Sequence, residues 1–304
     1  MKSVTLLKTY LLACLVPVIW GSTYVVTTEL LPDDIPLLAA VIRALPAGLI
    51  LLLMGGTLPR GEWWWKALVL GSLNIGAFFY LLFAAAYLMP GGIAALLMSS
   101  QPLFVLLLGG VLLKERIHSI KIVACLVGTF GVGLLVVQPH SALNPAGIII
   151  SLLGALSMAL GVVLTKRWGK PENVSLLGFT GWQLTAGGLV LLPIALSAEA
   201  LPASLSVSNV VGFLYLSLIG ALFAYVIWFR SLQTLPAFSV SFITMASPLS
   251  ATVLGYLILD QQFSLMQAGG ALLILAAMVL AQIKPAERAK PSSTAFYQAE
   301  EKVN

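Results

Sequence analysis

The sequence predicts an all-α polytopic membrane protein with ten transmembrane helices, arranged as two inverted five-helix repeats. Composition, the number of long apolar runs and one doubled stretch carry this prediction. Hydrophobic residues make up 60% of the 304 residues, and charged residues make up only 9%. A soluble domain cannot bury so much apolar surface, whereas the hydrocarbon of a bilayer accepts it.

Ten apolar runs have about the length that a membrane span requires, which is roughly 20 residues. They are Tyr10–Thr28, Ile35–Met54, Trp65–Leu88, Ile93–Leu113, Ser119–Val137, Ala146–Thr165, Leu176–Ser197, Val207–Phe229, Ala237–Leu259 and Leu265–Ile283. Only MPGG at Met89–Gly92 separates the third run from the fourth. Joined, they would form a helix of about 68 Å, which is too long for a hydrocarbon core of about 30 Å.

One stretch occurs twice, beginning at Ser100 as SQPLFVLLLGGVLLKERIHSIK and at Ala246 as ASPLSATVLGYLILDQQFSLMQ. The alignment places Pro102 on Pro248. Each copy predicts an apolar helix broken near its start by proline, then a polar turn and a second apolar helix. The first turn carries KER and a further lysine, whereas the second carries DQQ without a cation. Because cytoplasmic loops collect Lys and Arg, we expect the unit to span the membrane in both orientations, as in inverted-repeat transporters.

The basic residues predict the orientation. With the N-terminus inside, 15 of the 16 Lys and Arg residues fall in inner segments, and the outer loops contain Glu and Asp instead. The positive-inside bias therefore predicts a multi-pass protein of the bacterial inner membrane with both termini in the cytoplasm. This orientation signal explains the net charge of +5 without a nucleic-acid partner.

The repeat divides the chain into three parts. Residues 1–140 form the first repeat with helices one to five, residues 141–284 form the second, and residues 285–304 are expected to be a disordered cytoplasmic tail. The second helix pairs with the seventh through Ile42–Gly48 and Trp182–Gly188, which places Arg43 opposite Gln183. The first and sixth helices pair through little beyond Gly21 and Gly161.

Motifs for catalysis, metal binding or nucleotide binding are absent from the sequence. It contains no GxGxxG after a strand, no GxxxxGK[ST] and no HExxH, and its two cysteines and two histidines have no metal-ligand spacing. We therefore expect no cofactor, no metal and no enzyme. The alternatives are an intramembrane enzyme or lipid-modifying protein, which would need reactive groups at depth, and a structural or signalling membrane protein.

The doubled pattern resembles the EamA family of the drug/metabolite transporter superfamily. The resemblance rests on WGSTY at Trp20–Tyr24, PGGIAALLMSSQPLFVLLLGGVLLKER at Pro90–Arg116, WQLTAGGLVLLP at Trp182–Pro193 and SPLSATVLGYLILDQ at Ser247–Gln261. TELLPDDIPLLAAVIRALPAGL, followed by LPRGEWWW, is similar to the pigment-efflux (PecM-type) branch. The resemblance implies a carrier of small metabolites, often an exporter of amino acids, amines or toxic compounds. It also implies a central cavity lined by helices 1–4 and 6–9.

Candidate substrate-binding residues are the polar and aromatic side chains of those eight helices. They are Trp20, Thr23, Tyr24, Arg43, Asn74, Phe78, Ser100, Gln101, Trp182, Gln183, Tyr225, Trp228 and Ser247. Helix packing is the alternative interpretation for each, because small polar groups also bond across helices in membranes. The expected partners are a small-molecule substrate and the lipid bilayer, and a homodimer is left open. Transport is expected to proceed by alternating access about a site at the midplane.

The opposite orientation of the two doubled turns is testable by labelling. In a background without Cys14 and Cys125, a cysteine at Ser264 should react with an impermeant thiol reagent in whole cells, and a cysteine at Ser119 should not. Equal labelling of both positions, or labelling of Ser119→Cys alone, would contradict the inverted repeat.

Overall fold

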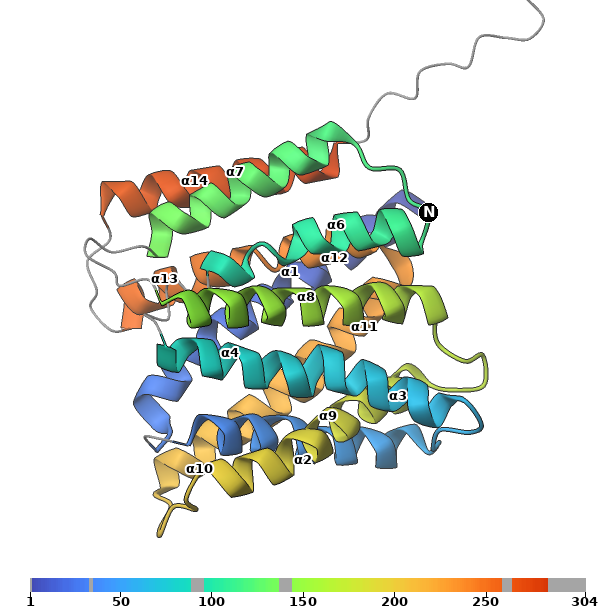
Figure 1. The fold of residues 1–304 in the computed structure, drawn as a ribbon, viewed down its shortest axis with the longest axis vertical. Helices are drawn as coiled ribbons and strands as arrows, with labels where there is room; N and C mark the ends of the chain where they lie inside the picture. The colour runs from blue at the N-terminus through green and yellow to red at the C-terminus, as the bar shows by residue number, and fades with distance from the viewer. Residues whose placement is uncertain (1, 33–34, 89–95, 137–143, 259–263, 284–304) are drawn as a thin grey trace, which may run out of the picture.

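The computed structural model describes residues 2–32, 35–88, 96–136, 144–258 and 264–283, and these residues form a bundle of roughly parallel and antiparallel helices (Figure 1). The helices of the first half are α1 (Lys2–Leu30), α2 (Pro36–Gly55), α3 (Trp63–Gly71), η1 (Ser72–Gly76), α4 (Ala77–Leu88), α6 (Gln101–Leu112) and α7 (Ser119–Val136). Those of the second half are α8 (Pro145–Trp168), α9 (Leu176–Ala198), α10 (Val207–Leu214), η2 (Tyr215–Phe223), α11 (Ala224–Thr234), α12 (Ala237–Ile243), α13 (Ala246–Ile258) and α14 (Leu265–Gln282).

The predicted fold class is confirmed. Within the described ranges, nine helical segments are long and apolar enough to cross a membrane, and Leu96–Leu112 is a shorter apolar helix. Large apolar side chains such as Leu53 and Val111 are 84% and 76% exposed on the outside of the bundle. Such a surface fits hydrocarbon rather than water.

The doubled stretch has the broken form that the sequence predicts. A turn at Ser99 and Ser100 precedes Pro102, and a turn at Thr244 and Met245 precedes Pro248. In Figure 1, α6 runs from left to right and α13 runs from right to left. The two copies therefore cross the bundle in opposite directions.

The third and eighth spans contain a feature that the sequence analysis missed. A π-helix, η1, lies between α3 and α4, and a second one, η2, lies between α10 and α11. A π-helix inserts extra residues into the helical turn and is often found at functional sites. Both π-helices lie near the middle of their spans, so they interrupt the helices at the depth where carriers bind substrate.

The two ends of the bundle differ in charge. The N-terminus of α1 and the α2–α3 and α8–α9 connections lie together on the right of Figure 1. These connections and the helix ends beside them carry more cations than anions: Arg60, Lys66, Lys166, Arg167, Lys170 and Arg230 against Glu62 and Glu172. We call this the basic end. The C-terminal end of α1, the start of α2 and the α9–α10 connection lie on the left, and this connection begins with Glu199. We call this the acidic end.

At the acidic end, Glu199 fixes the start of α2. Its two carboxylate oxygens accept hydrogen bonds from the backbone N–H groups of Leu37 and Leu38, each at 2.7 Å. The first N–H groups of a helix have no partner within the helix, and the helix dipole favours a negative charge there. This contact joins the α9–α10 connection to the helix that carries Arg43.

The two most extensive packings between the halves of the chain are α2 on α9 and α7 on α14. In Figure 1 they form opposite sides of the bundle, with the other spans between them. Glycines allow the close approach. A Cβ at Gly48 would lie 2.5 Å from the backbone nitrogen of Thr185, and a Cβ at Gly131 would lie 2.9 Å from the carbonyl oxygen of Gly270. Small residues at such crossings are typical of helices that associate in membranes.

Packing at the α2–α9 crossing should tolerate no added methyl group. Gly48→Ala should lower the free energy of unfolding by about 1–3 kcal/mol, because the backbone of α9 has to move. Gly269→Ala on α14 is the matched control, since a Cβ there would meet nothing within 4 Å. Thermal unfolding of both purified variants measures the difference, and equal stability of the two would contradict the tight crossing.

Candidate functional site

The carbonyl oxygen of Gly220, in η2, is the centre of the first polar cluster. It accepts hydrogen bonds from Nε1 of Trp20 at 3.2 Å and from Nη2 of Arg43 at 3.1 Å. The guanidinium carbon of Arg43 also lies 5.2 Å from the ring centroid of Phe79, a cation–π distance. These four residues, from α1, α2, α4 and η2, are the Arg43 cluster. A cation within a span is costly against lipid, and Arg43 is accordingly directed into the protein.

The second polar cluster centres on Asn74 in η1. Its Nδ2 donates to Oγ1 of Thr165 at 3.2 Å and to Oε1 of Gln183 at 2.9 Å. The Asn74 cluster consists of these three residues, which come from η1, α8 and α9. All three are buried, at 0%, 5% and 0% exposure in the order Asn74, Thr165, Gln183. Gly161 leaves room for the Asn74 side chain, because a Cβ at position 161 would lie 2.3 Å from Oδ1 of Asn74.

The Asn74 cluster retains hydrogen-bonding capacity. Oδ1 of Asn74 and Nε2 of Gln183 have no hydrogen-bond partner among the described residues. Leaving a buried polar atom without a partner costs about 1–3 kcal/mol. The cluster therefore offers an acceptor and a donor to any polar group that reaches it.

The two clusters occupy equivalent places in the two halves. Asn74 and Gly220 are 146 positions apart, as are Pro102 and Pro248. Arg43 lies seven residues after Pro36 at the acidic end, and Gln183 lies seven residues after Leu176 at the basic end. At 1.5 Å per residue, each backbone position is roughly 10 Å from its own end of the bundle. The clusters therefore lie on opposite sides of the midplane.

An aromatic group adjoins the Arg43 cluster. The ring of Trp20 lies 5.2 Å from that of Tyr225 and 5.4 Å from that of Trp228, between centroids. Both partners are buried on α11. Nε1 of Trp228 and Oγ1 of Thr23 have no hydrogen-bond partner within the described ranges. Neighbouring rings, tilted by 51° and 50° to the ring of Trp20, together with polar atoms that lack partners, suit an amphipathic organic ligand.

Several other candidates have local or packing contacts. Phe78 packs beside Phe79, with ring centroids 5.7 Å apart. The Ser100 hydroxyl donates to the carbonyl of Leu97 within its own turn, at 2.6 Å. Gln101 is buried, and its Nε2 has no partner among the described residues.

Two of the remaining candidates make other helix contacts, and the side chain of the third lies outside the described part of the chain. The Ser247 carbonyl lies where α1 crosses α13, 2.8 Å from the Cβ that a side chain at Gly21 would have. Trp182 donates from Nε1 to the carbonyl of Thr57 at 2.8 Å and so anchors α9 to the α2–α3 connection. Tyr24 belongs to α1, and its side chain lies outside the part that the structure describes.

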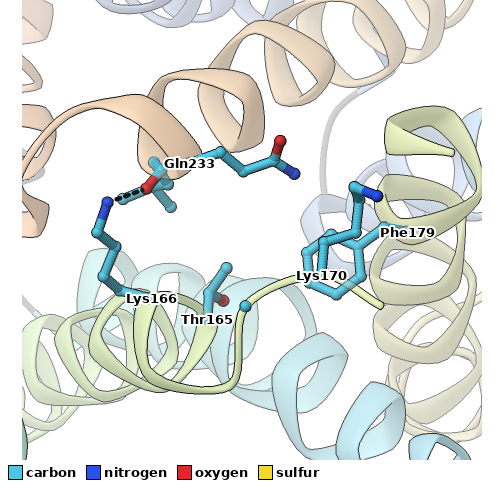
Figure 2. A pocket seen from close by; sticks show the side chains of 7 residues that line it. Thr165, Lys166, Lys170, Phe179 and Gln233 are labelled. Carbon is cyan, nitrogen blue, oxygen red and sulfur yellow. Dashed lines mark hydrogen bonds between the residues drawn. The ribbon is translucent and has the colours of Figure 1, made fainter. Parts of the chain in front are cut away.

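A pocket of about 340 Å³ lies at the basic end of the bundle (Figure 2). Its lining residues come from the last turn of α8, the connection that follows, the first turn of α9 and the last turn of α11; they are Thr165, Lys166, Gly169, Lys170, Phe179, Leu232 and Gln233. Thr165 belongs both to the pocket and to the Asn74 cluster. The pocket therefore leads from the basic end towards the midplane.

Sequence reasoning did not find several of these residues. In the sequence, Lys166 and Lys170 show only the charge signal of an inner loop, and Gly220 and Phe79 have no distinguishing feature. The offset of 146 positions could have pointed to Gly220, because it is the partner of Asn74 in the repeat. Among the residues that the structure describes, no group of three or more His, Cys, Asp or Glu could hold a metal ion.

The hydrogen bond between Asn74 and Gln183 should be measurable as a coupling energy. Asn74→Leu and Gln183→Leu should each lower the free energy of unfolding by about 1–3 kcal/mol, because each leaves a buried polar partner behind. The double variant should lose less than the sum, by about 0.5–2 kcal/mol. Ser100→Ala combined with Gln183→Leu is the control and should be additive. Strict additivity of the Asn74 and Gln183 changes would contradict the contact.

Comparison with known proteins adds a family to this geometry. The EamA-like transporter family matches the chain twice, over residues 7–137 and 145–282. The chain is 48% identical to "Protein PecM" of Dickeya dadantii, over 88% of this chain and 89% of that protein. It is 30% identical to the "Uncharacterized transporter sll0355" of Synechocystis sp., over 86% of each chain.

A further relative and a solved structure are consistent with this family and fold. The chain is 30% identical to the "Uncharacterized inner membrane transporter YedA" of Escherichia coli, over 78% of each chain. One solved crystal structure has a TM-score of 0.77 at 17% identity, covering 90% of this chain and 97% of the other, and so shares the fold. The matching family model and the Synechocystis and Escherichia coli relatives are named as transporters, which supports a transport protein rather than an enzyme. The chain belongs to the EamA-like transporter family and is a multi-pass inner-membrane transporter with PecM of Dickeya dadantii among its relatives.

Proposed function

We propose that this transporter exports small organic metabolites, such as amino acids, amines or toxic compounds, by alternating access. The basic end faces the cytoplasm, with both termini on that side, because cytoplasmic loops collect Lys and Arg. The observation that carries the proposal is the pair of polar clusters at equivalent positions in the two halves. Each includes a π-helix, and each lies on its own side of the midplane.

In this mechanism the clusters act as two latches. The Asn74 cluster holds α8 and α9 against η1 and closes the path from the basic end. The Arg43 cluster holds α1 and α2 against η2 and closes the path from the acidic end. Because a packed bundle switches between discrete arrangements rather than deforming continuously, opening one latch while the other stays closed gives access to one side at a time.

Substrate binds between the latches. The rings of Trp20, Tyr225 and Trp228 form an apolar wall, and the free acceptor and donor of the Asn74 cluster orient polar groups. When the solute binds, Oδ1 of Asn74 and Nε2 of Gln183 gain the hydrogen-bond partners that they lack in the closed latch. The site therefore favours a small molecule with both an apolar part and hydrogen-bonding groups.

Counterflow in proteoliposomes tests this function directly. Purified transporter is reconstituted into liposomes loaded with unlabelled amino acids, amines or aromatic solutes, one at a time, and uptake of the labelled solute is measured. A transient accumulation that needs the protein is the expected result for at least one class. Uptake that continues linearly without saturation would indicate a channel and would contradict alternating access.

Arg43 should matter for flux more than for folding. Arg43→Gln keeps a donor that can reach towards the Gly220 carbonyl but removes the charge and the cation–π contact with Phe79. It should insert normally and export poorly, with a raised half-saturation concentration. The loss of transport should be about five- to thirtyfold if one cation–π contact of about 1–2 kcal/mol is used during transport.

Arg230→Gln is the matched control, because Arg230 is an exposed arginine on α11 at the basic end. It should transport at the wild-type rate. Wild-type flux from well-expressed Arg43→Gln protein would remove Arg43 from the transport pathway.

A further inference from the structure

The pocket at the basic end has a cation on each side. In Figure 2, Lys166 lies on one side and Lys170, with Phe179, on the other, while Gln233 extends above the pocket and Thr165 lies at its base. Two ammonium groups around one small space raise the local positive potential, which a bound anion would reduce.

Each lysine retains an unused donor. Nζ of Lys166 donates to the carbonyls of Leu232 at 2.7 Å and Leu235 at 2.8 Å. Nζ of Lys170 donates to the carbonyl of Pro171 at 3.0 Å and to that of Val174. An ammonium group has three N–H donors and no acceptor, so each lysine has one donor without a partner among the described residues.

Neither lysine is neutralised by a carboxylate in contact with it, as far as the described residues extend. The ion pair within 4 Å in that part of the chain joins Lys66 and Glu62. Glu115, after α6, interacts with Lys166 only electrostatically. The positive charge of the pocket is therefore available to an anion from solution.

The rest of the lining indicates what kind of anion fits. Phe179 and Leu232 contribute apolar surface, and the side chains of Thr165 and Gln233 contribute hydroxyl and amide groups. Pockets of a few hundred Å³ with apolar walls and few polar groups are typical small-molecule sites.

We propose that this pocket is a loading site for small amphipathic organic anions, whose carboxylate is held by Lys166 and Lys170 and whose apolar body lies on Phe179. Its role in transport rests on the proposed export function; its ability to bind does not. A ligand bound in this pocket lies next to Thr165, whose hydrogen bond to Asn74 links the pocket to the Asn74 latch. The anion therefore reaches the latch from the side that faces the cytoplasm.

An anionic lipid headgroup has similar charge, but the lining favours a solute. Thr165 and Phe179 are only 5% and 2% exposed. Thr165 is also hydrogen-bonded to Asn74 in the bundle interior. The base of the pocket therefore lies inside the protein rather than on its lipid-facing surface.

Binding of phenylacetate to the purified full-length protein tests the site, with phenylacetamide as the uncharged probe of the same size. Isothermal titration calorimetry in nanodiscs of phosphatidylcholine at low salt should show binding of phenylacetate and at least about tenfold weaker binding of phenylacetamide. Lys170→Met should weaken phenylacetate binding about tenfold, as expected for loss of one charge-assisted hydrogen bond. Arg167→Met is the matched control, because Arg167 is exposed beside the pocket lysines in sequence and should bind as wild type.

Lys166 also caps α11, so Lys166→Met is paired with Lys166→Arg, which keeps the charge and should retain binding. Equal affinity for the two probes, no binding of phenylacetate, or an equal loss in Arg167→Met would overturn the site. Loss of phenylacetate binding when phosphatidylglycerol is added would assign the pocket to lipid and would also overturn it. Binding without phenylacetate flux would contradict only its export. Flux of other solutes without phenylacetate binding would contradict only the site.

Discussion

Polar groups inside the bundle must find their partners within the protein, because hydrocarbon offers none. This constraint explains why the carbonyl of Gly220 is shared by Trp20 and Arg43, and why Asn74, Thr165 and Gln183 come together from three helices. Each contact joins helices that are far apart in the chain. The same contacts that satisfy buried polar atoms therefore hold the helices in position. In the mechanism proposed above, one end of the bundle opens when these contacts break.

The clusters are equivalent in place but not in chemistry. Arg43 brings a charge to its cluster, whereas its repeat partner Gln183 brings an amide. The Arg43 cluster is held by a guanidinium group that contacts a backbone carbonyl and an aromatic ring. The Asn74 cluster is held by two neutral amides and a hydroxyl, and two of its amide atoms have no partner among the described residues. Under the alternating-access mechanism proposed above, such a difference would make the two closed states unequal in free energy.

Much of the fold could be predicted from the sequence, because membrane spans are set by apolar length and charge bias. The breaks before Pro102 and Pro248 followed from proline's missing donor. The repeat predicts that Arg43 and Gln183 occupy matching positions in the two halves of the chain. The π-helices could not be predicted, since Ser72–Gly76 and Tyr215–Phe223 contain no residue that forbids an α-helix. The pocket could not be predicted either, because Lys166 and Lys170 carry the same charge signal as any inner loop. Whether the thirteen candidate residues bind substrate stays a prediction.

The central claim is that the two clusters latch opposite ends of the bundle. Spin labels on cysteines at Leu88 and Val207 report the acidic end, and labels at Arg60 and Thr234 report the basic end, in a background without Cys14 and Cys125. Double electron–electron resonance in nanodiscs measures the distance between the two labels at each end, and the experiment requires no substrate. The account predicts that Gln183→Leu lengthens the Arg60–Thr234 distance and shortens the Leu88–Val207 distance, and that Arg43→Gln does the reverse. Changes in the same direction at both ends, or no change in either variant, would contradict it.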